Sequence, residues 1–341
     1  MRAYQLKKTG PPESLTIETL PDPKPGKDEV VVKLETIGLN YAEIQSRRGL
    51  YAWAPKRPYT PGMEGYGKII ATGSNVHERQ IGEPVIVAAQ YGCYAEQVCV
   101  PARQALPAMT EFSAAENAAL AVNFMTAWVA INRLLRLNAG EKILIHAAAG
   151  GVGTAAVQLA HALGAQVYGT VGSDEKRDLV ERLGARAVIN YRKADFAKEV
   201  RKLTGEEGLD AVIEVVGGQI FRKSLKLLKP FGRLVVMGFA SLNLNKYNPI
   251  SWVKTYRSIP RLKIAKMAQH SQMVGASHLG YLLNNPTLLP ELWVELVDFT
   301  RKHELRPVVG HTLSFEELPA AHVLMESRKS QGKIVLMINA D

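Results

Sequence analysis

The feature that most constrains the fold is an apolar run that meets a turn of small residues and continues as a helix-patterned segment. Residues 142–145 are β-prone, and the turn at 146–153 follows them directly. On the dinucleotide-binding pattern G-x-G-x-x-G, Ala148 takes the first position, Gly150 the second and Gly153 the third. Apolar residues then recur at helical spacing as far as Gly164, and a second strand is expected at 166–171. Strand, turn, helix and strand in this order favour a nucleotide-binding unit.

Such a turn can hold phosphate groups for two physical reasons. The second glycine lets the backbone approach a pyrophosphate, and the third lets the helix pack closely on the strand. The N–H groups that open a helix carry partial positive charge and favour a bound phosphate. A plain tight turn is the alternative reading. The residues predicted to bind the cofactor here are Ala149, Gly150, Gly151, Val152 and Gly153.

The patterning of the rest of the chain predicts an α/β protein with a discontinuous second domain. Strands at 167–171, 187–190, 210–216 and 233–237 alternate with helices at 174–183, 196–203 and 220–228, which is typical of a doubly wound parallel sheet. Residues 1–122 instead contain short β-prone runs between Pro/Gly clusters. After residue 281 we expect a helix at 289–301, an edge strand at about 305–309 and a closing strand at 333–336. A cofactor domain inserted into a discontinuous β domain accounts for this order.

The net charge of +10 is concentrated in one region. Between Glu214 and Glu291 there are eleven Lys or Arg residues and no Asp or Glu, so the rest of the chain is close to neutral. Residues 241–275 fit neither strand nor helix patterning and form a basic insertion, in which Lys254, Arg257 and Arg261 share one helical face. Bases beside apolar residues suit a lid over an anionic, apolar partner such as acyl-CoA or an anionic lipid surface. A solvated basic face over a dimer interface is the default alternative, and no nucleic-acid-binding motif is present.

Bulk properties indicate a cytoplasmic protein, with peripheral membrane contact if the basic insertion binds lipid. No apolar run reaches the roughly 18 residues that a membrane-spanning helix needs. The N-terminus lacks the apolar core of a signal peptide. Two cysteines, Cys93 and Cys99, cannot form a disulfide framework, which suits a reducing compartment.

Segments spread over nearly the whole chain resemble the zinc-independent quinone oxidoreductase branch of the medium-chain dehydrogenase/reductase family. The matching segments are 38–43, 48–51, 61–65, 146–153 and 188–191. Within that branch the chain is most similar to the VAT-1-like subgroup, on segments 60–65, 227–230 and 278–282.

This resemblance implies a central Rossmann domain at 123–280 and a β-rich, GroES-like catalytic domain built from 1–122 and 281–341. It also implies NADPH as cofactor and a homodimer formed through the edge strands of the Rossmann domains. In zinc-dependent relatives a cysteine would stand at Asn40 and a histidine at Met63. Catalytic zinc needs three N, S or O ligands, so we predict that this chain holds no metal.

The choice of cofactor depends on the end of the second Rossmann strand. An NAD enzyme places an Asp or Glu there, on the ribose 2′-OH. Here Ser173 can donate to a phosphate and Lys176 or Arg177 can neutralise it, although both bases also fit a solvated helix start. By resemblance, Tyr191 flanks the same phosphate. Asp174 and Glu175 keep NADH open, although the pattern favours NADPH.

At the reacting end, the resemblance places Asn40 and Tyr51 beside the nicotinamide. Hydride delivery makes an enolate or hydroquinone-like oxyanion, which needs hydrogen-bond donors and then a proton. Asn40 can donate through its amide and Tyr51 through its phenol. Alternatively, Asn40 caps a helix that begins at about Tyr41, and Tyr51 packs under a loop. The resemblance also implies that Phe239 and Arg328 contact the cofactor, and a basic surface turn is an equally good reading of Arg328.

Three functions are consistent with these features. The first is an NADPH-dependent reductase of quinones or α,β-unsaturated carbonyls. The second is an enoyl-thioester reductase, in which Tyr51 protonates the α-carbon and the basic insertion holds the phosphates of CoA. The third is a VAT-1-like protein that binds membrane lipid and keeps NADPH as a structural ligand.

Overall fold

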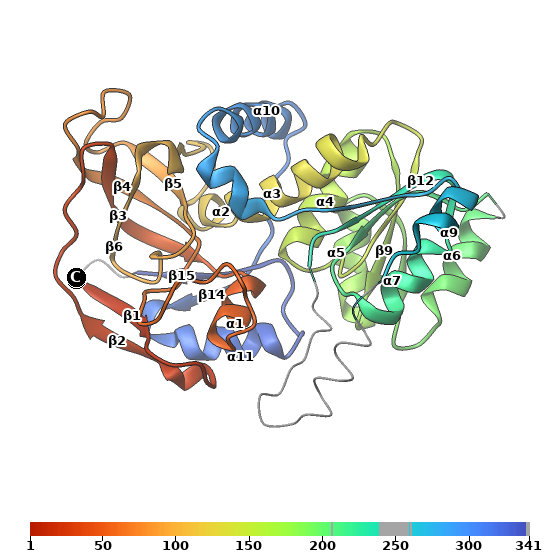
Figure 1. Ribbon diagram of the computed structural model, residues 1–341, viewed down its shortest axis with the longest axis horizontal. Coiled ribbons are helices and arrows are strands. Elements are labelled where there is room, and N and C mark those ends of the chain that lie inside the picture. The colour runs from red at the N-terminus through yellow and green to blue at the C-terminus, as the bar shows by residue number, and fades with distance from the viewer. Residues whose placement is uncertain (206, 239–258, 260, 339–341) are drawn as a thin grey trace. The chain divides into compact units, whose positions relative to one another are not determined.

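The computed structural model describes residues 1–205, 207–238, 259 and 261–338, whose helices and strands are drawn in Figure 1. The chain divides into two compact units. The first combines Met1–Met125 with Leu279–Asp341, and the second is Thr126–His278. Both ends of the chain therefore belong to one unit. The domain boundaries predicted at 122 and 281 stay a prediction.

The first unit is built on a seven-stranded sheet in the order β14-β15-β3-β4-β5-β7, in which β6 also pairs with β3. Its strands are β3 (Glu29–Gly38), β4 (Glu64–Thr72), β5 (Pro84–Ala88), β6 (Gln97–Pro101), β7 (Ala105–Pro107), β14 (Val309–Ser314) and β15 (Lys333–Met337), and β1 (Arg2–Leu6) pairs with β2 (Leu15–Thr19) beside them. Only β14 and β15 run parallel. The strand β15 pairs with the end of β3, where Val335 lies opposite Gly38, so the C-terminal segment closes a sheet that the N-terminal segment began.

The core of this unit is centred on β3, in which seven of the ten residues are buried and with which three strands pair. Its apolar residues pack with Ile334 and Leu336 of β15 and with Phe315. The helices assigned wholly or partly to this unit are α1 (Tyr41–Arg47), α2 (Ala114–Ala118), α3 (Ala121–Trp128), α10 (Leu288–Lys302) and α11 (Leu318–Glu326).

The second unit is a doubly wound, fully parallel sheet in the order β10-β9-β8-β11-β12-β13. Its strands are β8 (Lys142–Ile145), β9 (Gln166–Val171), β10 (Ala185–Asn190), β11 (Leu209–Glu214), β12 (Leu228–Val236) and β13 (Met273–Ala276). Its helices are α4 (Gly151–Ala162), α5 (Arg177–Arg182), α6 (Phe196–Thr204), α7 (Gly218–Leu225) and α9 (Ile264–Gln269).

The strand order of this sheet confirms the predicted Rossmann topology. The chain runs outward from β8 to β9 and β10 and then returns to β11 on the other side of β8. Ligands of such sheets bind at the carboxyl ends of the strands where the order reverses. Ile143, Leu144 and Ile145 are completely buried, as expected for a central strand covered on both faces.

Two predicted elements are displaced along the sequence. The edge strand expected at 305–309 is wrong in position, since β14 starts only at Val309 and pairs there with Lys333. Pro307 lacks the N–H group that a paired strand donates, so the chain becomes a strand only after it. The strand β12 begins at Leu228 instead of residue 233, and α7 correspondingly ends at Leu225.

Most of the predicted basic insertion lies outside the described residues, and so does the predicted cofactor residue Phe239. Of the three bases assigned to one helical face, only Arg261 is described, and it is exposed. Within the described part of the chain, no helix combines the length and the apolar character needed to cross a membrane.

Candidate functional site

The predicted cofactor turn connects β8 to α4 in the second unit. Ala147 adopts a left-handed conformation with a φ of 51°, and Gly150 N donates to Ala147 O at 2.9 Å. The helix α4 begins at Gly151, and Gly150 at its N-cap provides no side chain to cap it. The N–H groups of the first helical turn have no acceptor within the helix. They are therefore the natural donors for a phosphate at this end of the sheet.

Close packing explains why the third position of the motif, Gly153, is a glycine. A Cβ on Gly153 would lie 2.3 Å from Ala147 O, a backbone atom that cannot move away without breaking the turn. A Cβ on Gly150 would meet only Ala147 O, at 3.3 Å, so space remains open in front of the turn. Gly153 therefore packs against the turn, and access of a pyrophosphate at Gly150 stays a prediction.

A second group of predicted residues meets at the end of β9. The hydroxyl oxygen of Tyr191 lies 2.7 Å from the point that a Cβ on Gly172 would occupy, and Arg192 Nε lies 3.7 Å from it. Ser173 is the next residue. The pKa of Lys176 is lowered, first by burial and then by the positive charge of Arg192. The tyrosine, the serine and two cations therefore surround one strand end, which suits a phosphate on the ribose.

Of the two acidic residues that left NADH open, Asp174 is engaged elsewhere, and Glu175 is exposed. The Asp174 carboxylate accepts from Asn190 Nδ2 at 2.9 Å and forms an ion pair with Lys193. The hydrogen bond from Lys193 is the main cause of the lowered pKa of Asp174. Sequence reasoning did not select Arg192. Its position directly after Tyr191, at the end of the third strand, was the available signal.

Tyr51 is positioned by the end of helix α1 in the first unit. Gly49 has a φ of 74°, a conformation that favours glycine. Gly49 N donates to Ser46 O at 2.9 Å and Leu50 N donates to Gln45 O at 2.8 Å, the paired bonds of a Schellman motif. The chain reverses at this cap and continues directly into Tyr51.

Tyr51 is held in its protonated form. Burial raises its pKa to about 12, and the nearby charges of Glu43 and Tyr281 add to the shift. Its ring packs edge-to-face on Trp53 with the centroids 6.4 Å apart. Below about pH 12 the phenol therefore keeps its proton and can act as a donor.

Asn40 lies in a buried polar cluster that the sequence did not predict. Lys333 Nζ donates to Asn40 Oδ1 at 2.7 Å, forms an ion pair with Glu64 and lies 3.5 Å from Asn123 Oδ1. The amide nitrogen of Asn40 donates to Glu64 Oε1 at 3.1 Å. Lys333 is only 2% exposed and Glu64 is completely buried. Both ends of the Asn40 amide are thus engaged inside the first unit.

Asn40 is also the N-cap residue of α1, the position that the alternative interpretation of this asparagine predicted. Glu43 Oε2 accepts from Asn40 N at 2.9 Å, the reciprocal bond of a capping box. Glu43 is itself buried, and burial raises its pKa. The bonds to Lys333 and Glu64 fix the Asn40 side chain, and the bond from its backbone N–H to Glu43 fixes the start of α1.

The polar contacts continue from Glu43 toward helix α11. Tyr94 donates a short hydrogen bond to Glu43, and its hydroxyl oxygen lies 3.1 Å from His322 Nε2. Arg47 Nε donates to His322 Nδ1 at 3.3 Å, and Arg47 pairs with Glu326 at 2.5 Å. Burial lowers the pKa of His322 to about 3, so the imidazole is neutral and Nε2 carries the proton donated to Tyr94. This chain of contacts ties α1 to α11.

The donor set around Asn40 is a poor match to a zinc site. It offers amide oxygens, the Glu43 and Glu64 carboxylates and the Lys333 ammonium, but no Cys or His, whereas zinc sites use Cys, His and carboxylate ligands. Among the residues that the structure describes, no group of three or more His, Cys, Asp or Glu could hold a metal ion. Cys93 is buried, and burial raises the pKa of its thiol.

The C-terminal segment contributes Lys333 to the cluster around Asn40, and Arg328 does not belong to that cluster. Arg328 lies exposed in the turn after α11, with a φ of 59°. Lys333 opens a strand whose next three residues are completely buried. No local sequence signal marked this buried cation, since Lys142 likewise stands directly ahead of three completely buried residues and is only partly buried.

Family comparisons match both units of the chain. Residues 26–110 match the family described as alcohol dehydrogenase GroES-like domain, and residues 151–272 match zinc-binding dehydrogenase. The chain is 33% identical over 317 residues to a human protein named synaptic vesicle membrane protein VAT-1 homolog, covering 92% of this chain and 80% of the relative. Human quinone oxidoreductase is 30% identical, with 99% of this chain and 98% of the relative covered.

A solved structure supports the same relationship. The crystal structure of Escherichia coli quinone oxidoreductase complexed with NADPH matches with a TM-score of 0.88 and 27% identity, covering 99% of this chain and all of that chain. The predicted fold, a Rossmann sheet with a discontinuous GroES-like domain, is thereby confirmed. The chain belongs to the medium-chain dehydrogenase/reductase family, in the branch that contains quinone oxidoreductases and VAT-1 homologues.

Proposed function

We propose that this chain is a zinc-independent, NADPH-dependent oxidoreductase that transfers hydride to a quinone or an α,β-unsaturated carbonyl. The observation that carries the proposal is the pair of cations, Lys176 and Arg192, beside Tyr191 at the end of β9. The names of the human and E. coli quinone oxidoreductases, and the NADPH in the latter's structure, support it.

The cofactor would be held by two of its phosphate groups, the pyrophosphate and the ribose 2′-phosphate. The N–H groups of residues 149–153 at the start of α4 would bind the pyrophosphate. Ser173, Lys176, Tyr191 and Arg192 would surround the 2′-phosphate. Phe239 and Arg328 remain proposed contacts on the strength of the family resemblance. When bound, NADPH supplies the hydride.

The contribution of the chain at the reacting end is a proton from Tyr51 and a fixed conformation around Asn40. As the acceptor gains hydride, negative charge develops on its carbonyl oxygen. Tyr51 keeps its proton up to about pH 12 and can deliver it to that oxygen or to the neighbouring carbon. Lys333 and Glu64 hold Asn40 in one orientation, so the segment between β3 and α1 keeps its shape during the reaction.

The alternatives receive less support from the described residues. Enoyl-thioester reduction and lipid binding both depend on the basic insertion, most of which lies outside the described residues. The homodimer through the Rossmann edge strands also stays a proposal.

The test is consumption of NADPH with 1,4-naphthoquinone and with an enone as acceptors. Tyr51→Phe should lower kcat with the enone by about 100-fold, because general acid catalysis typically contributes 10²–10⁴-fold. Tyr91→Phe is the matched control, because Tyr91 is an exposed tyrosine of the same unit. Absence of NADPH consumption with both acceptors would contradict the proposed function. An unchanged rate in Tyr51→Phe would remove Tyr51 as the proton donor.

A further inference from the structure

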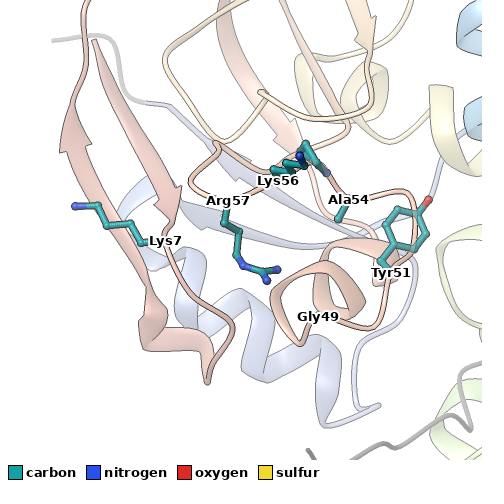
Figure 2. A pocket seen from close by; sticks show the side chains of 7 residues that line it. Lys7, Gly49, Tyr51, Ala54, Lys56 and Arg57 are labelled. Atoms are coloured by element: carbon teal, nitrogen blue, oxygen red, sulfur yellow. The ribbon is translucent and has the colours of Figure 1, made fainter.

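An open hollow of about 610 Å³ lies within the first unit, between the end of β1, the C-terminus of α1 and the loop that carries Tyr51. Its lining residues are Lys7, Gly49, Tyr51, Ala54, Pro55, Lys56 and Arg57. Three of them are cationic and none is acidic (Figure 2). The volume lies within the range of small-molecule sites, about 300–1,000 Å³.

The walls of the hollow are held in place by bonds to the sheet and to β1. Gln90 Nε2 donates to Trp53 O at 2.5 Å, and Leu6 N donates to Tyr59 O at 2.9 Å, so both ends of the loop are anchored. The Schellman motif at Gly49 fixes the other side. A ligand would therefore enter a largely preformed site, without having to order a loop.

Two of the three cations keep their charge uncompensated. Lys7 forms an ion pair with Glu18 at 2.6 Å, and its ammonium points away from the hollow (Figure 2). Lys56 and Arg57 are exposed, and neither forms an ion pair with any residue in the described part of the chain. The concave surface concentrates their field and attracts anions.

We propose that this hollow binds an anionic group of the hydride acceptor, such as a carboxylate, sulfonate or phosphate. The proposal rests on the proposed function, because it joins the anion site to the proton donor Tyr51. In Figure 2 the Tyr51 hydroxyl points away from the Arg57 guanidinium, and Ala54 lies between them. The acceptor that fits is one whose anionic group is separated from its reactive carbonyl by an apolar segment.

The test compares two probes of nearly equal shape, naphthalene-2-sulfonate and the neutral naphthalene-2-sulfonamide, by calorimetric titration. Lys56→Gln/Arg57→Gln removes the two charges. Lys24→Gln/Lys27→Gln is the matched control, because it removes two exposed charges of the same unit that do not line the hollow. The wild type and the control should bind the sulfonate about tenfold more tightly than the sulfonamide, and the first variant should lose this preference.

Binding is measured without turnover, so the result does not depend on whether the reductase assay succeeds. No sulfonate binding, equal binding of both probes, or a preference that survives in Lys56→Gln/Arg57→Gln would overturn the anion site. In the reductase assay the sulfonate should raise the KM for naphthoquinone without changing kcat. If the sulfonate lowers kcat without raising the KM, it binds away from the acceptor. The hollow would then not hold an anionic group of the hydride acceptor.

Discussion

Lys333→Met is expected to destabilise the protein by about 3–5 kcal/mol, measured as the free energy of unfolding in urea. The substitution keeps most of the length of the side chain but removes the ammonium that pairs with the buried Glu64 carboxylate. It also leaves Asn40 Oδ1 without its closest donor. A buried charge without a partner is far more costly than the loss of a surface ion pair. Lys329→Met, at an exposed lysine of the same segment, should change stability by less than about 0.5 kcal/mol.

A second substitution separates the charge effect from a packing effect. Glu64→Gln combined with Lys333→Met removes both charges and should recover most of the lost stability, because the residual pair is neutral. If Lys333→Met alone yields no folded protein, recovery of folded protein in the double variant gives the same answer. A double variant no more stable than Lys333→Met would show that the ion pair does not account for the role of Lys333.

Arg192→Ala should raise the Kd for NADPH by about 10–100-fold and leave the Kd for NADH nearly unchanged. A hydrogen bond to a charged group contributes about 1.5–3 kcal/mol, and each 1.4 kcal/mol corresponds to a tenfold change in affinity. Only NADPH carries the phosphate that Arg192 and Lys176 would contact. The measurement is fluorescence titration with each coenzyme.

Lys198→Ala is the control for this variant, because Lys198 is an exposed base on α6 of the same unit. It should leave both dissociation constants within about twofold. Equal losses for NADPH and NADH in Arg192→Ala would place the arginine outside the 2′-phosphate site.

The cofactor turn was predictable because its determinants are local. Gly150, Gly153 and the apolar strand before them lie within twelve residues, and steric limits on Cβ atoms act at that range. The Rossmann strand order was predictable for a related reason, since alternating strand and helix patterns admit few topologies.

The buried cluster around Asn40 was not predictable in the same way. Lys333 meets Glu64 across 269 residues of sequence, and hydrophobic periodicity does not encode which distant polar groups pair. The orientation of Asp174 likewise depends on Asn190, which ends a different strand, and on Lys193, which follows that strand. Only the tertiary structure shows which partners Glu64 and Asp174 bind.

The most direct test of the account is a titration of the wild-type protein with NADPH and with NADH. Saturable binding of one NADPH per chain, at least about tenfold tighter than NADH, is the predicted result, because the cations at the end of β9 favour the phosphorylated coenzyme. Failure to bind either coenzyme, or NADH bound as tightly as NADPH, would contradict it.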